Sequence, residues 1–201
     1  ERASAYSTDN ERFGLIRLSS SAAIVVGFLF LGGLELYDRW IGAMFGPGWQ
    51  QFVAFFVGLH LITSLLELPF DVYGTLHIEQ RHGFNHMSLG LLLADWCKST
   101  LLGAVLVGIV SACGYGLYRA SPGWYWLWFW LFAVGLAVLL MLIAPSVIEP
   151  LFIKTKPLAN DDLVARVREL GARVGVEVSQ VLEVDASRRT AHSNAYFTGI
   201  G

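Results

Sequence analysis

The chain has 201 residues, of which 55% are hydrophobic and 15% are charged, and its mean hydropathy is +0.54. Soluble domains carry about 25% charged residues, so this chain lacks the charge to cover a water-facing surface, and a soluble single domain is not expected. The net charge of −2 provides no basic surface for neutralising phosphates. Nucleic acid is therefore not an expected partner.

The charged residues are unevenly distributed along the chain. Of the 14 basic and 16 acidic residues, 13 lie in the 51 residues from 151 to 201. This shift in composition divides the chain into a lipid-soluble and a water-soluble part. It predicts a polar N-terminal segment over residues 1–17, a transmembrane helical region over 18–150 and the start of a soluble domain over 151–201.

Four apolar stretches approach or exceed the length of about 20 helical residues that crosses a bilayer. They are Leu18–Leu34, Ile41–Leu66, Ser99–Tyr118 and Ala120–Ile148. Gly46-Pro47-Gly48 interrupts the second stretch, so its helix is expected to begin near Trp49. The third helix is expected to extend back to about Ser88. The sequence thus predicts a multi-pass α-helical membrane protein with about four transmembrane helices.

The basic residues outside the spans predict the orientation. Four spans place the N-terminal segment, the loop 67–87 and the C-terminal tail on one side of the membrane. That side carries Arg2, Arg12, Arg17, Arg81, Lys154 and Lys156, whereas the opposite loops carry Arg39 and Arg119. By the positive-inside rule, the tail is expected in the cytoplasm, at the cell membrane or the endoplasmic reticulum membrane.

The tail has the pattern of a soluble α/β structure. Asn160 is a candidate cap for an amphipathic helix that ends at Gly175. A strand is expected over Val178–Val184, followed by a polar turn, and a second strand over Ala195–Gly199. The predicted order is helix, strand, strand.

Several ionisable residues lie within the apolar stretches, where charge is costly and indicates function. His60, Ser64 and Glu67 form one stripe on the second helix, and Asp95 and Lys98 can pair on the third. Two interpretations remain open: polar contacts between helices, or the lining of a hydrated cavity. The second would also be compatible with an ion path in a transporter.

The loop after the second span contains His77, Glu79, His82 and His86, residue types that bind metals. The spacing of His82 and His86 would suit a helix, but Gly83 and Asn85 lie between them and disfavour a regular helix. A structural loop is the better interpretation. His192-Ser193-Asn194 likewise lacks a visible third group to orient a serine–histidine pair, which argues against serine hydrolase chemistry.

Several segments together resemble one family. They are Leu68-Pro69-Phe70-Asp71-Val72-Tyr73, Ile78-Glu79-Gln80-Arg81-His82-Gly83-Phe84-Asn85, Pro150-Leu151-Phe152, Ser187-Arg188-Arg189 and His192-Ser193-Asn194-Ala195-Tyr196-Phe197. In order and spacing they are similar to the type I CAAX prenyl proteases, which are integral-membrane zinc endopeptidases. The resemblance extends over essentially the whole chain.

The resemblance implies a zinc cofactor (Zn2+) and a tail that begins a cytoplasmic zincin-like α/β domain. In the family, zinc is bound by H-E-x-x-H and a later glutamate, and the glutamate of the motif is the general base. No H-E-x-x-H occurs between Glu1 and Gly201. The zinc ligands are therefore expected beyond this chain, which contains no catalytic or metal-binding residue of its own and should not be active alone.

The resemblance also implies the substrate and where it binds. The expected partners are membrane lipid and peptide or protein substrates, either prenylated or otherwise membrane-associated. A zincin holds an extended peptide against a strand, and the segment entering the last predicted strand is the candidate: Asn194, His192, Ala195 and Tyr196. The alternative is a non-catalytic membrane scaffold or a transporter-like homologue that lacks the zinc site.

Overall fold

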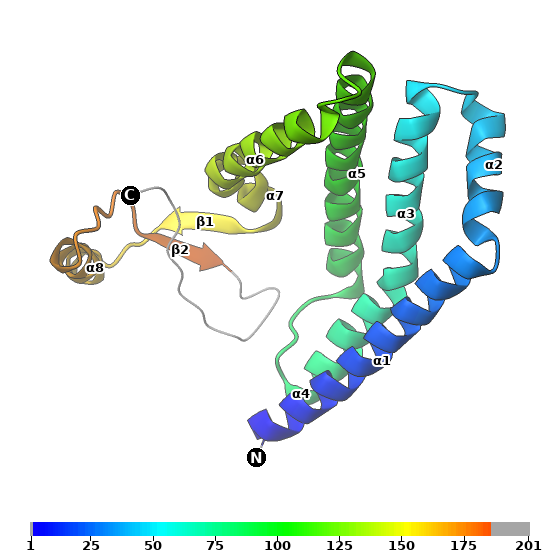
Figure 1. The fold of residues 1–201 in the computed structure, drawn as a ribbon. Coiled ribbons are helices and arrows are strands. Elements are labelled where there is room, and N and C mark those ends of the chain that lie inside the picture. The colour runs from blue at the N-terminus through cyan, green and yellow to red at the C-terminus, as the bar shows by residue number, and fades with distance from the viewer. Residues whose placement is uncertain (1, 186–201) are drawn as a thin grey trace. The chain divides into compact units, whose positions relative to one another are not determined.

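The computed structural model describes residues 2–185 (Figure 1). They form two compact units, one ending at Val134 and one beginning at Gly135. The elements in chain order are α1 Arg2–Phe30, α2 Gly33–Phe45, α3 Trp49–Tyr73, the π-helical η1 Gly74–Glu79, α4 Gln80–His82, α5 Leu89–Ala120, α6 Tyr125–Ile143, the π-helical η2 Ala144–Ile148, α7 Glu149–Phe152, β1 Lys154–Pro157, α8 Asp161–Arg173 and β2 Leu182–Asp185.

Among residues 2–185, four helical segments are long and apolar enough to cross a membrane, as the sequence predicts. They are Ala5–Phe30, Trp49–His82, Leu89–Ala120 and Tyr125–Phe152. The expected helix starts are confirmed: α3 begins at Trp49, and Ser88 caps α5 by accepting a hydrogen bond from the Leu91 backbone N–H. Residues 2–17 and the first apolar run as far as Phe30 form one continuous helix, α1, which the charge pattern alone does not predict.

The first unit is held together where α2, α3 and α5 pack. α3 and α5 run side by side (Figure 1), and a Cβ at Gly103 of α5 would lie 2.6 Å from the His60 ring of α3. On the other side, Tyr37 of α2 is buried against α3 and donates a 2.8 Å hydrogen bond to the Phe55 carbonyl. Burial raises the pKa of this Tyr37 hydroxyl, so it remains a donor.

In the tail, the predicted helix is confirmed, and the first strand begins later than predicted. Asn160 Oδ1 accepts a 3.0 Å hydrogen bond from the Leu163 N–H at the start of α8, and Gly175 follows the helix with a φ of +75°. The strand expected over Val178–Val184 forms only from Leu182 to Asp185. It pairs antiparallel with β1, from Lys154↔Asp185 to Pro157↔Leu182, a partner that the sequence pattern does not reveal.

Candidate functional site

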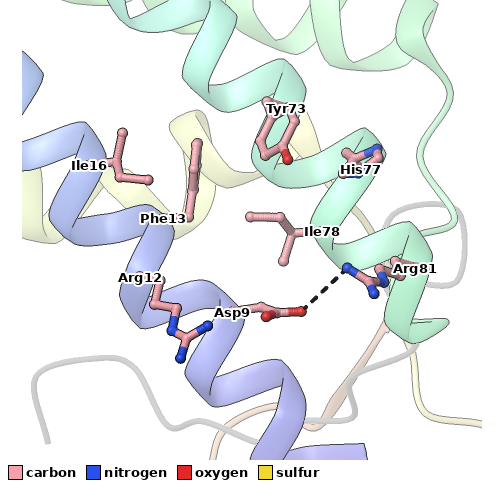
Figure 2. A pocket seen from close by; sticks show the side chains of 8 residues that line it. All are labelled: Asp9, Arg12, Phe13, Ile16, Tyr73, His77, Ile78 and Arg81. Atoms are coloured by element: carbon pink, nitrogen blue, oxygen red, sulfur yellow. Dashed lines mark ion pairs between the residues drawn. The ribbon is translucent and has the colours of Figure 1, made fainter.

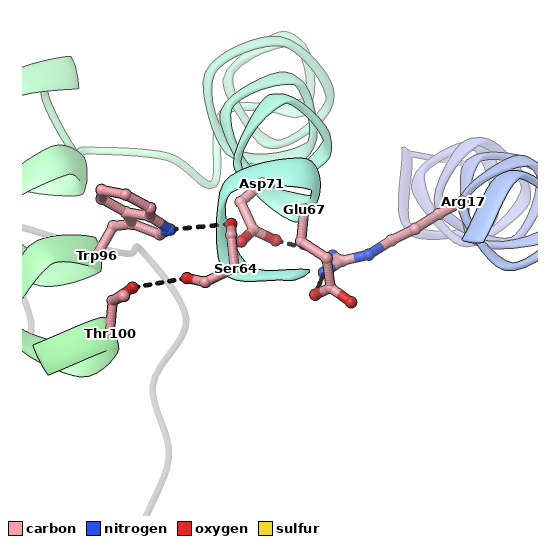
Figure 3. A network of polar contacts seen from close by, with 6 residues as sticks. All are labelled: Arg17, Ser64, Glu67, Asp71, Trp96 and Thr100. Atoms are coloured by element: carbon pink, nitrogen blue, oxygen red, sulfur yellow. Dashed lines mark hydrogen bonds and ion pairs between the residues drawn. The ribbon is translucent and has the colours of Figure 1, made fainter. Parts of the chain in front are cut away.

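Two members of the polar stripe on α3, His60 and Ser64, bond to α5, and Figure 3 shows the contacts of Ser64. Ser64 Oγ lies 2.6 Å from Thr100 Oγ1, and the Ser64 carbonyl accepts a 3.3 Å hydrogen bond from Trp96 Nε1. His60 Nε2 lies 3.1 Å from the Thr100 carbonyl oxygen, an acceptor, so this nitrogen carries the proton. These groups satisfy one another between helices, as expected where water is excluded.

The third member of the stripe bonds to α1 instead. Arg17 donates to Glu67 Oε2 and to Asp71 Oδ1, each at 2.8 Å (Figure 3). One guanidinium thus bridges two carboxylates one helical turn apart, which leaves one negative charge in excess. Together with the Ser64 contacts, this forms a polar network across α1, α3 and α5. The structure favours interhelix contacts for these residues over an unpartnered ion path.

The other charged pair lies on α5 alone. Lys98 Nζ is 3.3 Å from Asp95 Oδ1, at the predicted i,i+3 spacing. This pairing confirms the expectation from the sequence. Asp95 and Lys98 thus serve as counterions to each other within one helix.

The histidine-containing loop after α3 is organised by caps and ion pairs. Gly83 adopts a φ of +78° and ends α4, so His82 and His86 do not share a helix. His82 Nε2 donates to Asp9 Oδ2 of α1 at 3.0 Å. Asn85 Oδ1 accepts a 2.6 Å hydrogen bond from the Met87 backbone N–H, and the structural interpretation of this loop is thereby supported.

The zinc that the resemblance implies does not fit the described residues. Among residues 2–185, no group of three or more His, Cys, Asp or Glu side chains is placed to hold a metal ion. His82, the best candidate ligand, is instead directed at one carboxylate and contacts the Tyr6 ring edge-on at 5.4 Å. No chemical step through a metal can be derived from this part of the chain.

A pocket of about 190 Å³ lies between α1 and η1 (Figure 2). It is lined by Asp9, Arg12, Phe13, Ile16, Tyr73, His77, Ile78 and Arg81. Arg81 Nη1 lies 3.9 Å from Asp9 Oδ2, and the Tyr73 and His77 rings stack with centroids 4.8 Å apart. The expected substrate-binding residues Asn194, His192, Ala195 and Tyr196 lie outside the described residues.

Sequence reasoning missed Arg17 as the partner of the stripe. Arg17 is 50 residues from Glu67 and 54 from Asp71, and neither distance leaves a local pattern. The one available signal was an excess of carboxylates at the end of the second span, which requires a cation from another helix.

Known proteins resemble most of this chain. Residues 1–154 match the family model described as CAAX prenyl protease N-terminal, five membrane helices. A Caenorhabditis elegans CAAX prenyl protease 1 homolog is 32% identical over 99% of this chain and 44% of its own length. A probable CAAX prenyl protease 1 of Schizosaccharomyces pombe is 34% identical over 73% of this chain and 31% of its own.

A solved structure gives the same result for the fold. The crystal structure of S. mikatae Ste24p superposes with a TM-score of 0.89 at 26% identity, covering 97% of this chain and 47% of that one. The chain thus spans about half, or less, of the length of the relatives it matches. With the family model covering more than half of the chain and four spans in the structure, this multi-pass membrane protein belongs to the CAAX prenyl protease family.

Proposed function

We propose that this chain is the membrane part of a zinc endopeptidase that cleaves prenylated or membrane-associated protein substrates. The observation that carries the proposal is the match of the helical region, residues 1–154, to the N-terminal region of the CAAX prenyl proteases. The names of the relatives in C. elegans and S. pombe support the same activity. In this proposal the four spans position substrate at the membrane, and the polar network of α1, α3 and α5 maintains their arrangement.

The proposed zinc requires ligands that residues 1–201 do not supply as a motif. The described residues hold no group of three metal-binding side chains, and H-E-x-x-H is absent from the sequence. We therefore propose that the ligands are encoded after Gly201. Translation of the downstream reading frame tests this directly: an H-E-x-x-H supports the enzyme, and a stop codon shortly after Gly201 would contradict it.

The substrate is proposed to bind along the segment that contains Asn194, with His192, Ala195 and Tyr196 beside it. An extended peptide aligned by main-chain hydrogen bonds presents its scissile bond in one register. An asparagine amide offers both donors and an acceptor for such a backbone. These roles rest on the resemblance of His192-Ser193-Asn194-Ala195-Tyr196-Phe197 to the family.

The orientation is also a proposal: the tail from Lys154 onward faces the cytoplasm. Single cysteines introduced at Gly46 and at Asp161, in a background without Cys97 and Cys113, report the side by labelling of intact cells. We expect the cysteine at position 46 to react with an impermeant reagent and that at position 161 to remain unlabelled. The reverse pattern would contradict the proposed orientation.

The activity is tested with the protein expressed from its full reading frame and reconstituted in phospholipid vesicles. We expect cleavage of a farnesylated peptide that ends in a free carboxylate, loss of cleavage on chelation and recovery on adding zinc. A scaffold or a transporter-like homologue would show no cleavage, although the comparisons do not favour either. Folded protein that leaves the peptide intact with zinc present would therefore refute the enzyme.

A further inference from the structure

The pocket between α1 and η1 has no role in the proposed cleavage, yet it combines charge with an apolar floor. Phe13, Tyr73 and Ile78 provide the apolar walls, and Ile78 is 6% exposed (Figure 2). The polar part consists of two arginines and one aspartate, which leaves a formal excess of one positive charge with His77 neutral. A ligand that fits this lining carries negative charge and an apolar part.

Of the two arginines, Arg81 forms one long ion pair and Arg12 forms none among residues 2–185. Asp9 is held at 3.0 Å by His82, and Arg81 lies 3.9 Å from the same carboxylate, at the limit of an ion pair. Within residues 2–185, Arg12 makes no ion pair or side-chain hydrogen bond. A guanidinium presents a planar fork of donors that matches the oxygens of a phosphate, and here two of them line one pocket.

The pocket lies where the polar beginning of α1 meets its apolar continuation. Ile16, at the pocket edge, is 60% exposed, and Ile24, about two turns further along α1, is 44% exposed. Both helices that form the pocket belong to membrane-spanning segments. The arginines therefore lie near headgroup depth, and the exposed side chains of Ile16 and Ile24 lie between them and the hydrocarbon core.

We propose that this pocket binds the phosphate-bearing head group of an anionic membrane phospholipid. Arg12 and Arg81 bind the phosphate, and one acyl chain follows α1 past Ile16. The apolar lining of Phe13, Tyr73 and Ile78 and the exposed Ile16 favour a lipid over a free phosphate ion, which would use neither. The inference rests on membrane insertion of α1 and α3, and not on cleavage or on the zinc ligands.

The test uses the protein expressed from its full reading frame and transferred to nanodiscs or micelles with defined lipids. Native mass spectrometry counts molecules of phosphatidylglycerol retained relative to phosphatidylcholine. One basic residue near an anionic surface contributes about fivefold in binding, so we expect Arg12→Gln to lower phosphatidylglycerol retention about fivefold. The double variant with Arg81→Gln is expected to lower it further.

Arg39→Gln is the matched control, because Arg39 also lies 3.9 Å from a carboxylate, that of Glu35, and is similarly exposed, at 69% against 72% for Arg81. It should leave retention unchanged. Arg12 has no partner to lose in the part of the chain that the structure describes, so Arg12→Gln should keep the thermal midpoint in phosphatidylcholine. Equal retention by the double variant and the wild type would overturn the proposal, as would displacement of phosphatidylglycerol by millimolar inorganic phosphate.

Discussion

Polar side chains are used differently in the helical bundle and in the tail. In the bundle the polar network joins separate helices: Arg17 reaches Glu67, and Ser64 reaches Thr100. In α8 of the tail they join neighbours on the same helix, with Asp162 and Arg166 3.0 Å apart and about three-quarters exposed.

The atom-to-atom distances are nearly the same in the two regions, so distance alone does not rank the contacts. Water competes for an exposed ion pair, and an i,i+4 pair on a helix contributes about 0.3–0.5 kcal/mol. A polar group inside a membrane has no such competitor, and losing its partner leaves it unsatisfied. The surrounding solvent therefore determines what each contact contributes to stability.

The largest expected effect comes from removing the cation of the bundle network. Arg17→Gln leaves Glu67 and Asp71 without a counterion. Breaking a fully buried pair costs about 3–5 kcal/mol, and because these side chains are 35–43% exposed, we expect about 3 kcal/mol at most. Denaturant titration in detergent micelles measures the change in unfolding free energy.

The control for this variant is Arg39→Gln, which breaks an exposed pair and should cost less than about 0.5 kcal/mol. If both substitutions had the same small effect, the bundle network would contribute no more than a surface pair. The contrast between interhelix contacts and exposed pairs within one helix would then be refuted.

The next effect tests the close approach of α3 and α5. A methyl group at Gly103 would lie 2.6 Å from His60 Nε2, so Gly103→Ala displaces the ring and weakens its bond to Thr100. Overpacking of this kind costs about 1–3 kcal/mol, and we expect about 2 kcal/mol by the same titration.

Gly116 lies on the same helix with nothing within 4 Å of an added Cβ. Gly116→Ala should therefore stabilise the protein, by about 0.5–1 kcal/mol through helix propensity. If Gly103→Ala stabilised the protein as Gly116→Ala is expected to, the two helices would not be in close contact at Gly103.

For Asn194 in the tail, we expect a substitution to lower the rate of catalysis and to leave folding unchanged. If Asn194 binds the substrate backbone, Asn194→Ala loses one hydrogen bond, worth about 0.5–1.5 kcal/mol, and kcat/KM of the full-length enzyme falls roughly tenfold. Steady-state kinetics on a farnesylated peptide measure this change. Ser193→Ala, beside it, is the control. Wild-type kinetics of the Asn194 variant would rule out the substrate role.

The smallest effect is expected on α8. Asp162→Asn removes one exposed i,i+4 pair and weakens the acidic first turn of the helix, and the cost should stay below about 1 kcal/mol. The cost should also shrink in high salt, because exposed pairs are screened. A cost above that of Arg17→Gln would reverse the comparison between the two regions.

Patterns within one element could be predicted from the sequence. The start of α3 follows from Gly46-Pro47-Gly48, the start of α5 from Ser88 and that of α8 from Asn160, because each depends on neighbouring residues. The pairing of Asp95 with Lys98 depends only on helical spacing.

Features that depend on distant partners could not be predicted. Nothing near Arg17 indicates that it reaches two carboxylates on another helix. β1 is a short run of lysine, threonine and proline without strand alternation, and it becomes a strand because β2 supplies the hydrogen bonds. The candidate site was predicted only through the resemblance, and its residues 192–196 stay a prediction.

The connection between α7 and β1 limits how far the tail can move. One residue, Ile153, separates the end of the helix at Phe152 from the start of the strand at Lys154, and one residue spans at most about 3.6 Å. The start of β1 is therefore held within a few ångström of the end of the fourth span. Residues inserted beside Ile153 would let β1 lie further from the end of α7 without changing either element.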